Sequence, residues 1–237
     1  MRCRAAFALA AVVLASLVAG CATVEAPLAP AGGSRLPPDF PEDAYRQAAA
    51  RGQAVYRIEP AASLVEIEVR RGGSLARLGH DHVVASRDVA GFVAPSGGRA
   101  DLAVPLASLT VDEPALRAEA GFDTQPSASD IAGTRANMLG PVLDAERFPF
   151  VQIAVRAAGA ASGSMEVAIA LHGVTRRFDV PVDVEVSGDA LVASGRLSLD
   201  QTAFGIVPYS LLGGAIAVQD RVDLRFRIRA VRVDARG

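Results

Sequence analysis

From residue 54 onward, apolar and polar residues alternate along the chain with a period of two. Val65, Ile67 and Val69 are separated by charged residues. The same alternation occurs in several later segments, at residues 102–106, 151–155, 165–171, 178–186, 191–199 and 222–228. Successive side chains of a strand point to opposite faces, so each segment predicts a strand with one apolar and one polar face. Such strands are typical of antiparallel sheets, whose second face meets solvent, and not of parallel α/β sheets.

Turn residues and one helical stretch interrupt this pattern. Gly72-Gly73 and Pro95–Gly98 are turn signals between strands. Residues 114–120 and 127–139 have helical composition, with Ser127 or Ser129 as a candidate N-cap. The chain therefore predicts about nine strands with short helices inserted between them. A sheet of this size with one apolar face must close or fold over on itself, so we expect an all-β barrel or two-sheet sandwich.

The N-terminus has the features of a targeting signal. Arg2 and Arg4 precede an apolar run over residues 5–18, which is too short to span a bilayer. The run ends in Leu17-Val18-Ala19-Gly20-Cys21, which resembles the bacterial lipobox, the signal in which the cysteine becomes the acylated first residue. We therefore expect residues 1–20 to be a lipoprotein signal peptide and Cys21 to be lipidated. An ordinary cleaved signal with an incidental cysteine is the alternative.

The rest of the chain divides into three predicted parts. Residues 21–41, rich in Ala, Pro and Gly, predict a flexible tether. Pro41 and the acidic residues after it predict a short helix within residues 42–53. Residues 54–234 form the predicted barrel domain. Because Ala22, and not Asp, follows the cysteine, the lipobox resemblance implies a lipid-anchored protein on the periplasmic face of the bacterial envelope, at the outer membrane.

Composition excludes several classes of function. The chain is 51% hydrophobic, which excludes a disordered protein. Its net charge of −2 provides no net positive charge to attract nucleic acid. If Cys3 leaves with the signal and Cys21 carries lipid, no cysteine remains for a disulfide, a zinc site or a nucleophile. There is no Gly-x-Ser-x-Gly motif, phosphate loop or dinucleotide fingerprint, so we expect no enzyme activity. Glu66 and Glu68 are expected to be solvated on the charged face of their strand.

The predicted interior leaves two alternatives. A barrel of about eight strands is filled by its own side chains or encloses one small ligand, and periodicity does not separate these cases. A filled core would make the protein a structural or interaction domain of the envelope. If a ligand binds, the apolar inner faces favour a hydrocarbon chain over a sugar or nucleotide.

Short motifs along the chain carry a family resemblance. They occur in order as Tyr56–Pro60, Phe148–Val151, Leu171–Thr175, Phe204–Ile206 and Asp220–Val222. Together they resemble the YceI-like, polyisoprenoid-binding family, and the segment around His172 is the most specific match. The resemblance implies a lipocalin-like antiparallel β-barrel with a helical insertion. It also implies binding of an isoprenoid or fatty-acid-like amphiphile inside the barrel. The two histidines in Leu75–His82 and the segment Pro208–Ala217 depart from common members.

Candidate site residues follow from this reading of the interior. Inward positions expected to line the ligand tail are Val151, Ile153, Ile169, Val182 and Leu197. Polar residues expected to hold the head group are Arg77, His80, His82 and His172. On a strand, His80 and His82 would point to one face, with Asp81 opposite.

The histidines also allow two other interpretations. His80, His82 and His172 could form a three-nitrogen metal or haem site of a redox protein. They could also be strand-end or loop residues whose ring nitrogens bond to backbone groups. We expect no cofactor other than a bound lipid-like ligand, and the oligomeric state is left open.

Overall fold

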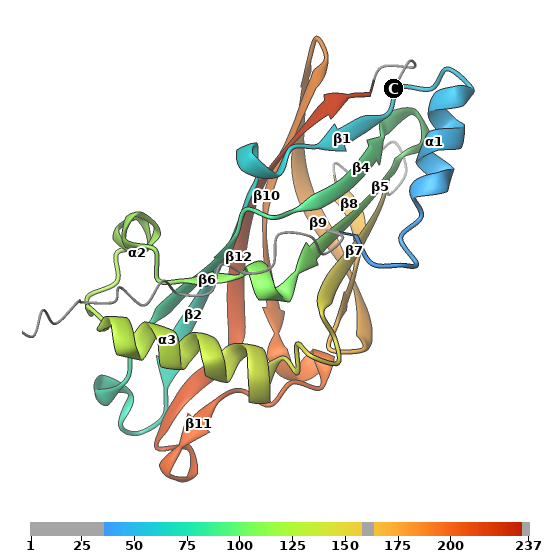
Figure 1. Cartoon of the computed structure of the whole chain (residues 1–237). Helices are drawn as coiled ribbons and strands as arrows, with labels where there is room; N and C mark the ends of the chain where they lie inside the picture. Colours follow the sequence, from blue (N-terminus) through green and yellow to red (C-terminus); the bar gives the residue numbers. More distant parts are fainter. Residues whose placement is uncertain (1–35, 158–163, 234–237) are drawn as a thin grey trace, which may run out of the picture. The chain divides into compact units, whose positions relative to one another are not determined.

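The strands form a closed antiparallel barrel, as the family resemblance implied, which decides between the barrel and the sandwich that the alternating pattern left open (Figure 1). The structure is a computed structural model that describes residues 36–157 and 164–233. The predicted signal peptide, Cys21 and most of the predicted tether lie outside the described residues. No helix within the described ranges is both long and apolar enough to cross a membrane.

The described chain contains three α-helices and twelve strands. The helices are α1 (Glu42–Ala50), α2 (Pro114–Ala120) and α3 (Ala128–Asn137). The first six strands are β1 (Tyr56–Ile58), β2 (Leu64–Gly72), β3 (His82–Ser86), β4 (Ala90–Ala94), β5 (Arg99–Pro105) and β6 (Thr110–Val111). The later strands are β7 (Phe150–Ala157), β8 (Ser164–Leu171), β9 (Val174–Ser187), β10 (Ala190–Asp200), β11 (Ser210–Leu211) and β12 (Ile216–Arg232).

Eight strands close the ring in the order β1-β4-β5-β7-β8-β9-β10-β12, and β12 pairs back with β1. The long strand β12 makes this closure possible because its two halves have different partners. Ala217–Arg227 pair with β2, whereas Ala230–Arg232 pair with β1. From β2 the sheet continues through β3 to β6, which ends the strand order. At one end of the barrel, the strands that continue the sheet from β12 are therefore β2, β3 and β6, and at the other end they are β1, β4 and β5.

The helical insertion fills the side of the barrel between β6 and β7. Arg135 of α3 donates hydrogen bonds to the carbonyl oxygens of Ala107 (2.6 Å) and Leu109 (3.1 Å). A π-helical turn, Met138–Val142, follows α3 and brings Met138 and Leu143 against the apolar core. The predicted helix over 127–139 is thus confirmed, with Ser127 as its N-cap.

Two outer faces that the alternation predicted to be solvated are instead covered by helices. On β5, the outward Asp101 is 6% exposed because α1 packs over it, and it accepts a hydrogen bond from the Tyr45 hydroxyl (2.7 Å). Burial, together with Asp101, raises the pKa of Tyr45 well above its usual range. The α1 helix itself lies within the predicted range 42–53.

The second covered face corrects the interpretation of Glu66. Leu116 of α2 packs on the outward side chains of Val83 and Ala85. Beside them, Glu66 is only 7% exposed and is paired with Arg225. The prediction that Glu66 is solvated was therefore wrong, because α2 excludes water from this part of the outer wall. Glu68, in contrast, is half-buried and pairs with Arg70 at 2.6 Å.

Candidate binding site in the barrel

The inner wall of the barrel contains two clusters of buried apolar side chains with a less buried belt between them. The first cluster includes Tyr56, Leu102 and Ile228, and the second includes Val180 and Phe204. Residues that pack against both clusters are all only partly buried, and they are Ile67, Val69, Leu143, Val151, Ile153, Val155 and Phe226. We call this set the inner belt. It shows that accessible apolar surface remains along the middle of the inner wall.

The structure places all five predicted tail-contacting residues on this inner wall. Val151 and Ile153 belong to the inner belt. Ile169 is 6% exposed within the second cluster, and Val182 and Leu197 are partly buried against it. The period-two pattern was sufficient to identify these positions, because one strand face had to point inward.

His80 and His82 lie next to each other at the start of β3. His82 is directly opposite Val69 of the inner belt in the β2–β3 register, so its side chain projects from the inner face. The rings of His80 and His82 meet edge to face with centroids 6.2 Å apart. The Nδ1 atom of His80 is buried and has no hydrogen-bond partner within the described residues. His82 therefore lies beside the apolar inner wall with His80 next to it, and we call these two residues the histidine rim. That they hold the head group of a ligand stays a prediction.

A buried carboxylate holds His82 in place. The side chain of Asp112 is 0% exposed, and its Oδ2 lies 2.6 Å from His82 Nδ1. Its Oδ1 accepts hydrogen bonds from the Val83 N–H (3.0 Å) and from Arg117 Nη1 (2.6 Å). Burial alone would raise the pKa of Asp112, but the bonds from His82, Val83 and Arg117 hold this pKa below its usual range. Asp112 is therefore a charged anchor for the imidazole.

Arg117 of α2 completes this anchor from outside the barrel wall. It donates to the backbone carbonyls of Asp81 (2.5 Å) and Thr124 (2.5 Å), and its guanidinium lies 5.5 Å from the Phe122 ring centroid. Sequence reasoning missed Asp112 and Arg117, although both are nearly fully buried. Their five-residue spacing crosses from a strand end into a helix, so no periodic pattern marks them.

The first turn of α3 brings a second carboxylate towards the histidines. Asp130 forms a capping box with Ser127, whose N–H and hydroxyl both donate to the Asp130 carboxylate. These hydrogen bonds hold the pKa of Asp130 below its usual range, and the charges of His80 and His82 lower the pKa further. Asp130 is therefore a second carboxylate within electrostatic reach of the two histidines.

The other two residues predicted for the head group lie elsewhere. Arg77 is exposed in the turn between β2 and β3 and makes no ion pair or hydrogen bond with the described part of the chain. His172 lies in the β8–β9 turn, where its ring centroid is 5.1 Å from that of Phe148 and its Nδ1 is 3.4 Å from the Phe204 carbonyl oxygen. His172 and Gly173 both have positive φ, and a Cβ at Gly173 would approach the Phe148 ring within 2.8 Å.

The positions of the three histidines can be compared with the alternative metal site considered from the sequence. Among the described residues, no group of three or more His, Cys, Asp and Glu side chains is arranged to hold a metal ion. His80, His82 and His172 are all described, and His172 contacts Phe148 and Phe204 instead of the other histidines. The structure therefore does not bring the three histidines of the alternative metal centre together as one ligand group.

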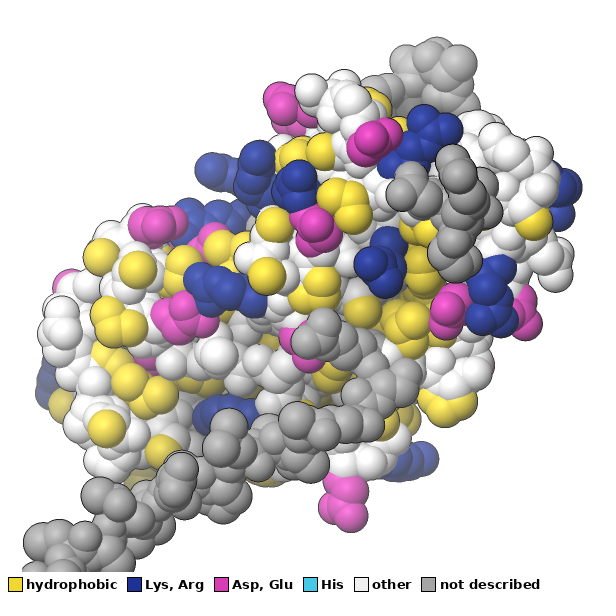
Figure 2. All heavy atoms as spheres, turned by 45° about the horizontal axis from the view of Figure 1, so that its top comes forward, with side chains coloured by type: hydrophobic (Ala, Val, Ile, Leu, Met, Phe, Trp, Pro, Cys, Tyr) yellow, Lys and Arg dark blue, Asp and Glu magenta, His cyan; other side chains and the backbone are white. Residues whose placement is uncertain are grey.

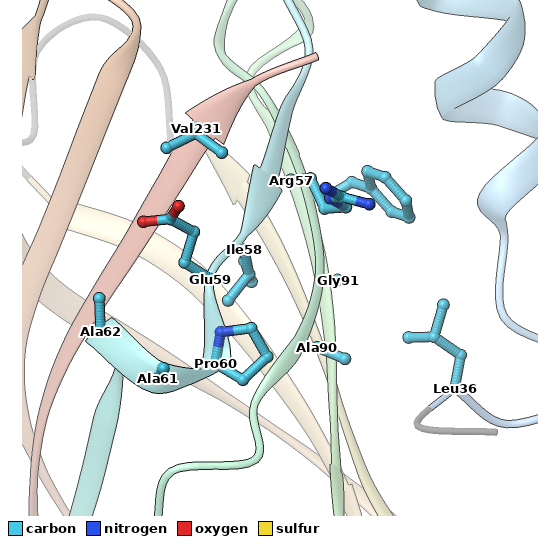
Figure 3. Close-up of a pocket in the computed structure, with 11 residues that line it drawn as sticks. Leu36, Arg57, Ile58, Glu59, Pro60, Ala61, Ala62, Ala90, Gly91 and Val231 are labelled. Carbon is cyan, nitrogen blue, oxygen red and sulfur yellow. The ribbon is translucent and has the colours of Figure 1, made fainter. Parts of the chain in front are cut away.

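A groove of about 660 Å³ lies on the outer face of β1 and β4 (Figure 3). Pro60, Ala61 and Ala90 form part of its wall, and Leu36 lies on its other side (Figure 3). Its one carboxylate, Glu59, is paired with Arg229 of β12. This groove is separate from the inner belt and from the histidine rim.

The surface has no concentration of one charge on the face seen in Figure 2. Arginine, acidic and apolar side chains are interspersed there. This agrees with the small net charge of the chain, −2. It gives no support to binding of a polyanion such as nucleic acid.

Comparison with known proteins gives a consistent family and fold. A family model described as YceI-like domain matches residues 56–230. A polyisoprenoid-binding domain from Saccharophagus degradans, implicated in plant cell wall breakdown, is similar with a TM-score of 0.55 and 14% identity, over 75% of this chain and 98% of that one. BcnA of Burkholderia cenocepacia is similar with a TM-score of 0.50 and 18% identity, over 73% of this chain and 99% of that one. No curated protein matches the chain. At these identities the structural likeness shows the fold.

Proposed function

Because the chain belongs to the YceI-like domain family, we propose that it binds a lipid-like amphiphile of the isoprenoid or fatty-acid type inside its barrel, without catalysis. The observation that carries this proposal is the inner belt, whose apolar side chains point inward and are only partly buried. The solved domain from Saccharophagus degradans, which is described as polyisoprenoid-binding, supports the same ligand class.

Simple energetics favour a long ligand. Burial of each methylene group contributes about 0.8 kcal/mol, so ten buried methylenes would contribute roughly 8 kcal/mol. Association costs about 4–15 kcal/mol in lost translational and rotational freedom. A short chain would therefore bind weakly, and tight binding requires a long tail together with polar contacts to the head group.

We assign the head-group contacts chiefly to His80 and His82. His82 lies at the inner face opposite Val69, and the Nδ1 atom of the neighbouring His80 is buried without a hydrogen-bond partner among the described residues. Asp112 and Arg117 are positioning residues in this proposal because they hold His82 and the backbone around it. Arg77 and His172 would contact the head group only from the β2–β3 and β8–β9 turns.

The binding experiment uses an inner and an outer position on the same strand. Val182 of β9 is partly buried inside, and its neighbour Asp183 is exposed outside. We expect Val182→Trp to reduce binding of the fluorescent fatty acid 11-(dansylamino)undecanoate at least tenfold, because the larger side chain fills the tail site. Asp183→Trp should bind as the parent does. Equal binding by both variants, or an absence of any lipid in native mass spectrometry of the purified chain, would contradict the proposal.

Competition separates the two ligand classes. Farnesol and oleate are added in turn to the dansyl-labelled complex. Displacement by farnesol at lower concentration supports an isoprenoid ligand, and displacement by oleate at lower concentration supports a fatty-acid-like one. If neither displaces the probe, the probe is bound outside the barrel and the proposed site is wrong.

We further propose that the protein is acylated at Cys21 and faces the periplasm at the outer membrane. This proposal rests on the sequence of residues 1–22 alone. Mass spectrometry of the N-terminal peptide from bacterial membranes should find diacylglycerol on Cys21, and Cys21→Ser should move the protein to the soluble fraction. An unmodified Cys21 in membrane-bound protein would refute this assignment.

A further inference from the structure

Large apolar side chains are unusually exposed at one end of the barrel. They come from the turn between β2 and β3 and from the segment around β11, and they are Leu78 (59% exposed), Val207 (78%), Leu211 (48%) and Leu212 (73%). We call these four residues the loop patch. Single exposed apolar residues are normal on protein surfaces, but four on neighbouring turns indicate an interaction surface.

The two segments of the loop patch lie side by side. The Leu75 N–H donates a hydrogen bond to the Ala215 carbonyl oxygen at 2.7 Å. Ala217 of β12 pairs with Ser210 of β11 on one side and with Gly72 of β2 on the other. Figure 1 shows β11 and the turn that follows it projecting beyond α3 at this end of the barrel. The turn that holds Leu78 and the segment that holds Leu211 and Leu212 are therefore neighbours at this end of the barrel.

The backbone at Leu212 is a second reason to expect a function. Leu212 has a φ of +51°, a conformation that favours glycine and is uncommon for a bulky side chain. Its side chain is 73% exposed, so packing within the described fold does not account for a leucine there. Such local strain is typical of segments that contact a partner.

The charged residues in the two segments of the loop patch indicate which kind of partner it contacts. Residues 75–79 and 206–216 contain no Asp or Glu. Their one charged side chain is Arg77, which is exposed and makes no ion pair with the described residues. Tyr209 adds an aromatic ring of the kind that is enriched at membrane interfaces. Apolar tips beside a cation suit a bilayer with anionic head groups.

We propose that the loop patch inserts into the surface of an anionic phospholipid bilayer and directs this end of the barrel towards the membrane. This contact does not depend on acylation of Cys21 or on a ligand in the barrel. A second copy of the chain and a protein partner are the other possible occupants, and the test below separates them from a bilayer.

The sequence contains no tryptophan, so a single introduced tryptophan reports by its fluorescence on the position where it is placed. Leu212→Trp places a single tryptophan in the loop patch. Val184→Trp is the matched control, because Val184 is 44% exposed and lies towards the β9–β10 turn, where Val186 is paired with Leu191 at the other end of the strands. Both are made in the full chain with Cys21→Ser, so that acylation does not contribute.

Vesicles of phosphatidylethanolamine and phosphatidylglycerol are added to each variant. We expect the Leu212→Trp emission to shift to the blue by about 10 nm or more and to be quenched by brominated acyl chains, while the Val184→Trp emission is unchanged. Equal shifts in the two variants, or no shift at position 212, would overturn the proposal. A shift that depends on protein concentration without vesicles would assign the loop patch to a second copy and also overturn it.

A second measurement tests the side chains themselves. Leu211→Ser combined with Leu212→Ser should reduce co-sedimentation with the same vesicles at least fivefold relative to the Cys21→Ser parent. Arg77→Ala should reduce binding to vesicles that contain phosphatidylglycerol and leave binding to pure phosphatidylcholine unchanged. If co-sedimentation is the same for all variants, the loop patch does not contact the bilayer.

Discussion

Replacement of Asp112 by Asn tests the buried anchor behind the histidine rim. Asn tolerates the positive φ of +57° at this position and still accepts a hydrogen bond from the Val83 N–H. The substitution removes the negative charge 2.6 Å from Arg117 Nη1 without creating a large cavity. It therefore isolates the electrostatic contribution of the carboxylate.

The structure indicates a large effect. The side chains of Asp112 and Arg117 are 0% and 9% exposed, so Asp112→Asn leaves a nearly buried guanidinium without its counter-charge. Loss of one partner of a buried pair costs about 3–5 kcal/mol. A domain of this kind is stable by about 5–15 kcal/mol, so the variant should lose roughly a fifth or more of its free energy of unfolding.

Urea unfolding followed by circular dichroism at pH 7 measures the loss. Glu113→Gln is the matched control, because the adjacent Glu113 pairs with Arg87 and both side chains are about a third or more exposed. Such a pair contributes about 0–1 kcal/mol. The double variant Asp112→Asn/Arg117→Met should lose at least about 2 kcal/mol less than the sum of its single variants, because it removes both buried charges.

Two results would refute this reasoning. One is a loss in Asp112→Asn no larger than in Glu113→Gln. The other is strict additivity in the double variant, which would show that the two charges do not interact in the folded state.

Three further predictions concern stability. Because the pKa of Asp112 is held below that of an unfolded Asp, about 3.9, its contribution is complete above that pH and is lost as the pH falls through the folded pKa. The parent should therefore lose more free energy of unfolding than Asp112→Asn between about pH 5 and pH 2, measured by urea titrations. Phe204→Ala should lose about 3–5 kcal/mol in the same assay, since Phe204 is 0% exposed at the centre of the second cluster. Gly91→Ala should lose more than about 2 kcal/mol, because φ is +148° and the new Cβ would lie 2.2 Å from the Asp101 carbonyl oxygen, whereas Gly97→Ala has nothing within 4 Å and should change little.

The long strands and the three α-helices were predictable because local signals specify them. The alternation over 178–186 and 191–199 lies within β9 and β10. Pro41 precedes α1, whose first turn holds the two acidic residues, and residues 114–120 coincide with α2. Short strands such as β1 and β6 have too few residues for a period to be recognised, and they exist because their neighbours provide pairing partners.

Burial of polar residues on the outer wall was not predictable from the sequence. Glu66 and Asp101 occupy alternating positions that are typical of a solvated face, and only the docking of α2 and α1 removes them from water. The same limit applies to Asp112 and Arg117. Their partners lie at His82, Asp81 and Thr124, and only the folded chain brings these together.

The closure of the barrel through β12 has a consequence for folding. Tyr56 near the start of the domain pairs with Arg232 near its end, and β10 and β2 also find their partners along β12. Pairings between such distant residues make folding slow, since a long loop must be ordered before they form. Until the last strand has been synthesised, β2 and β10 present unpaired edges that invite association with other chains. Truncation within residues 216–232 should therefore cause aggregation instead of a smaller folded barrel.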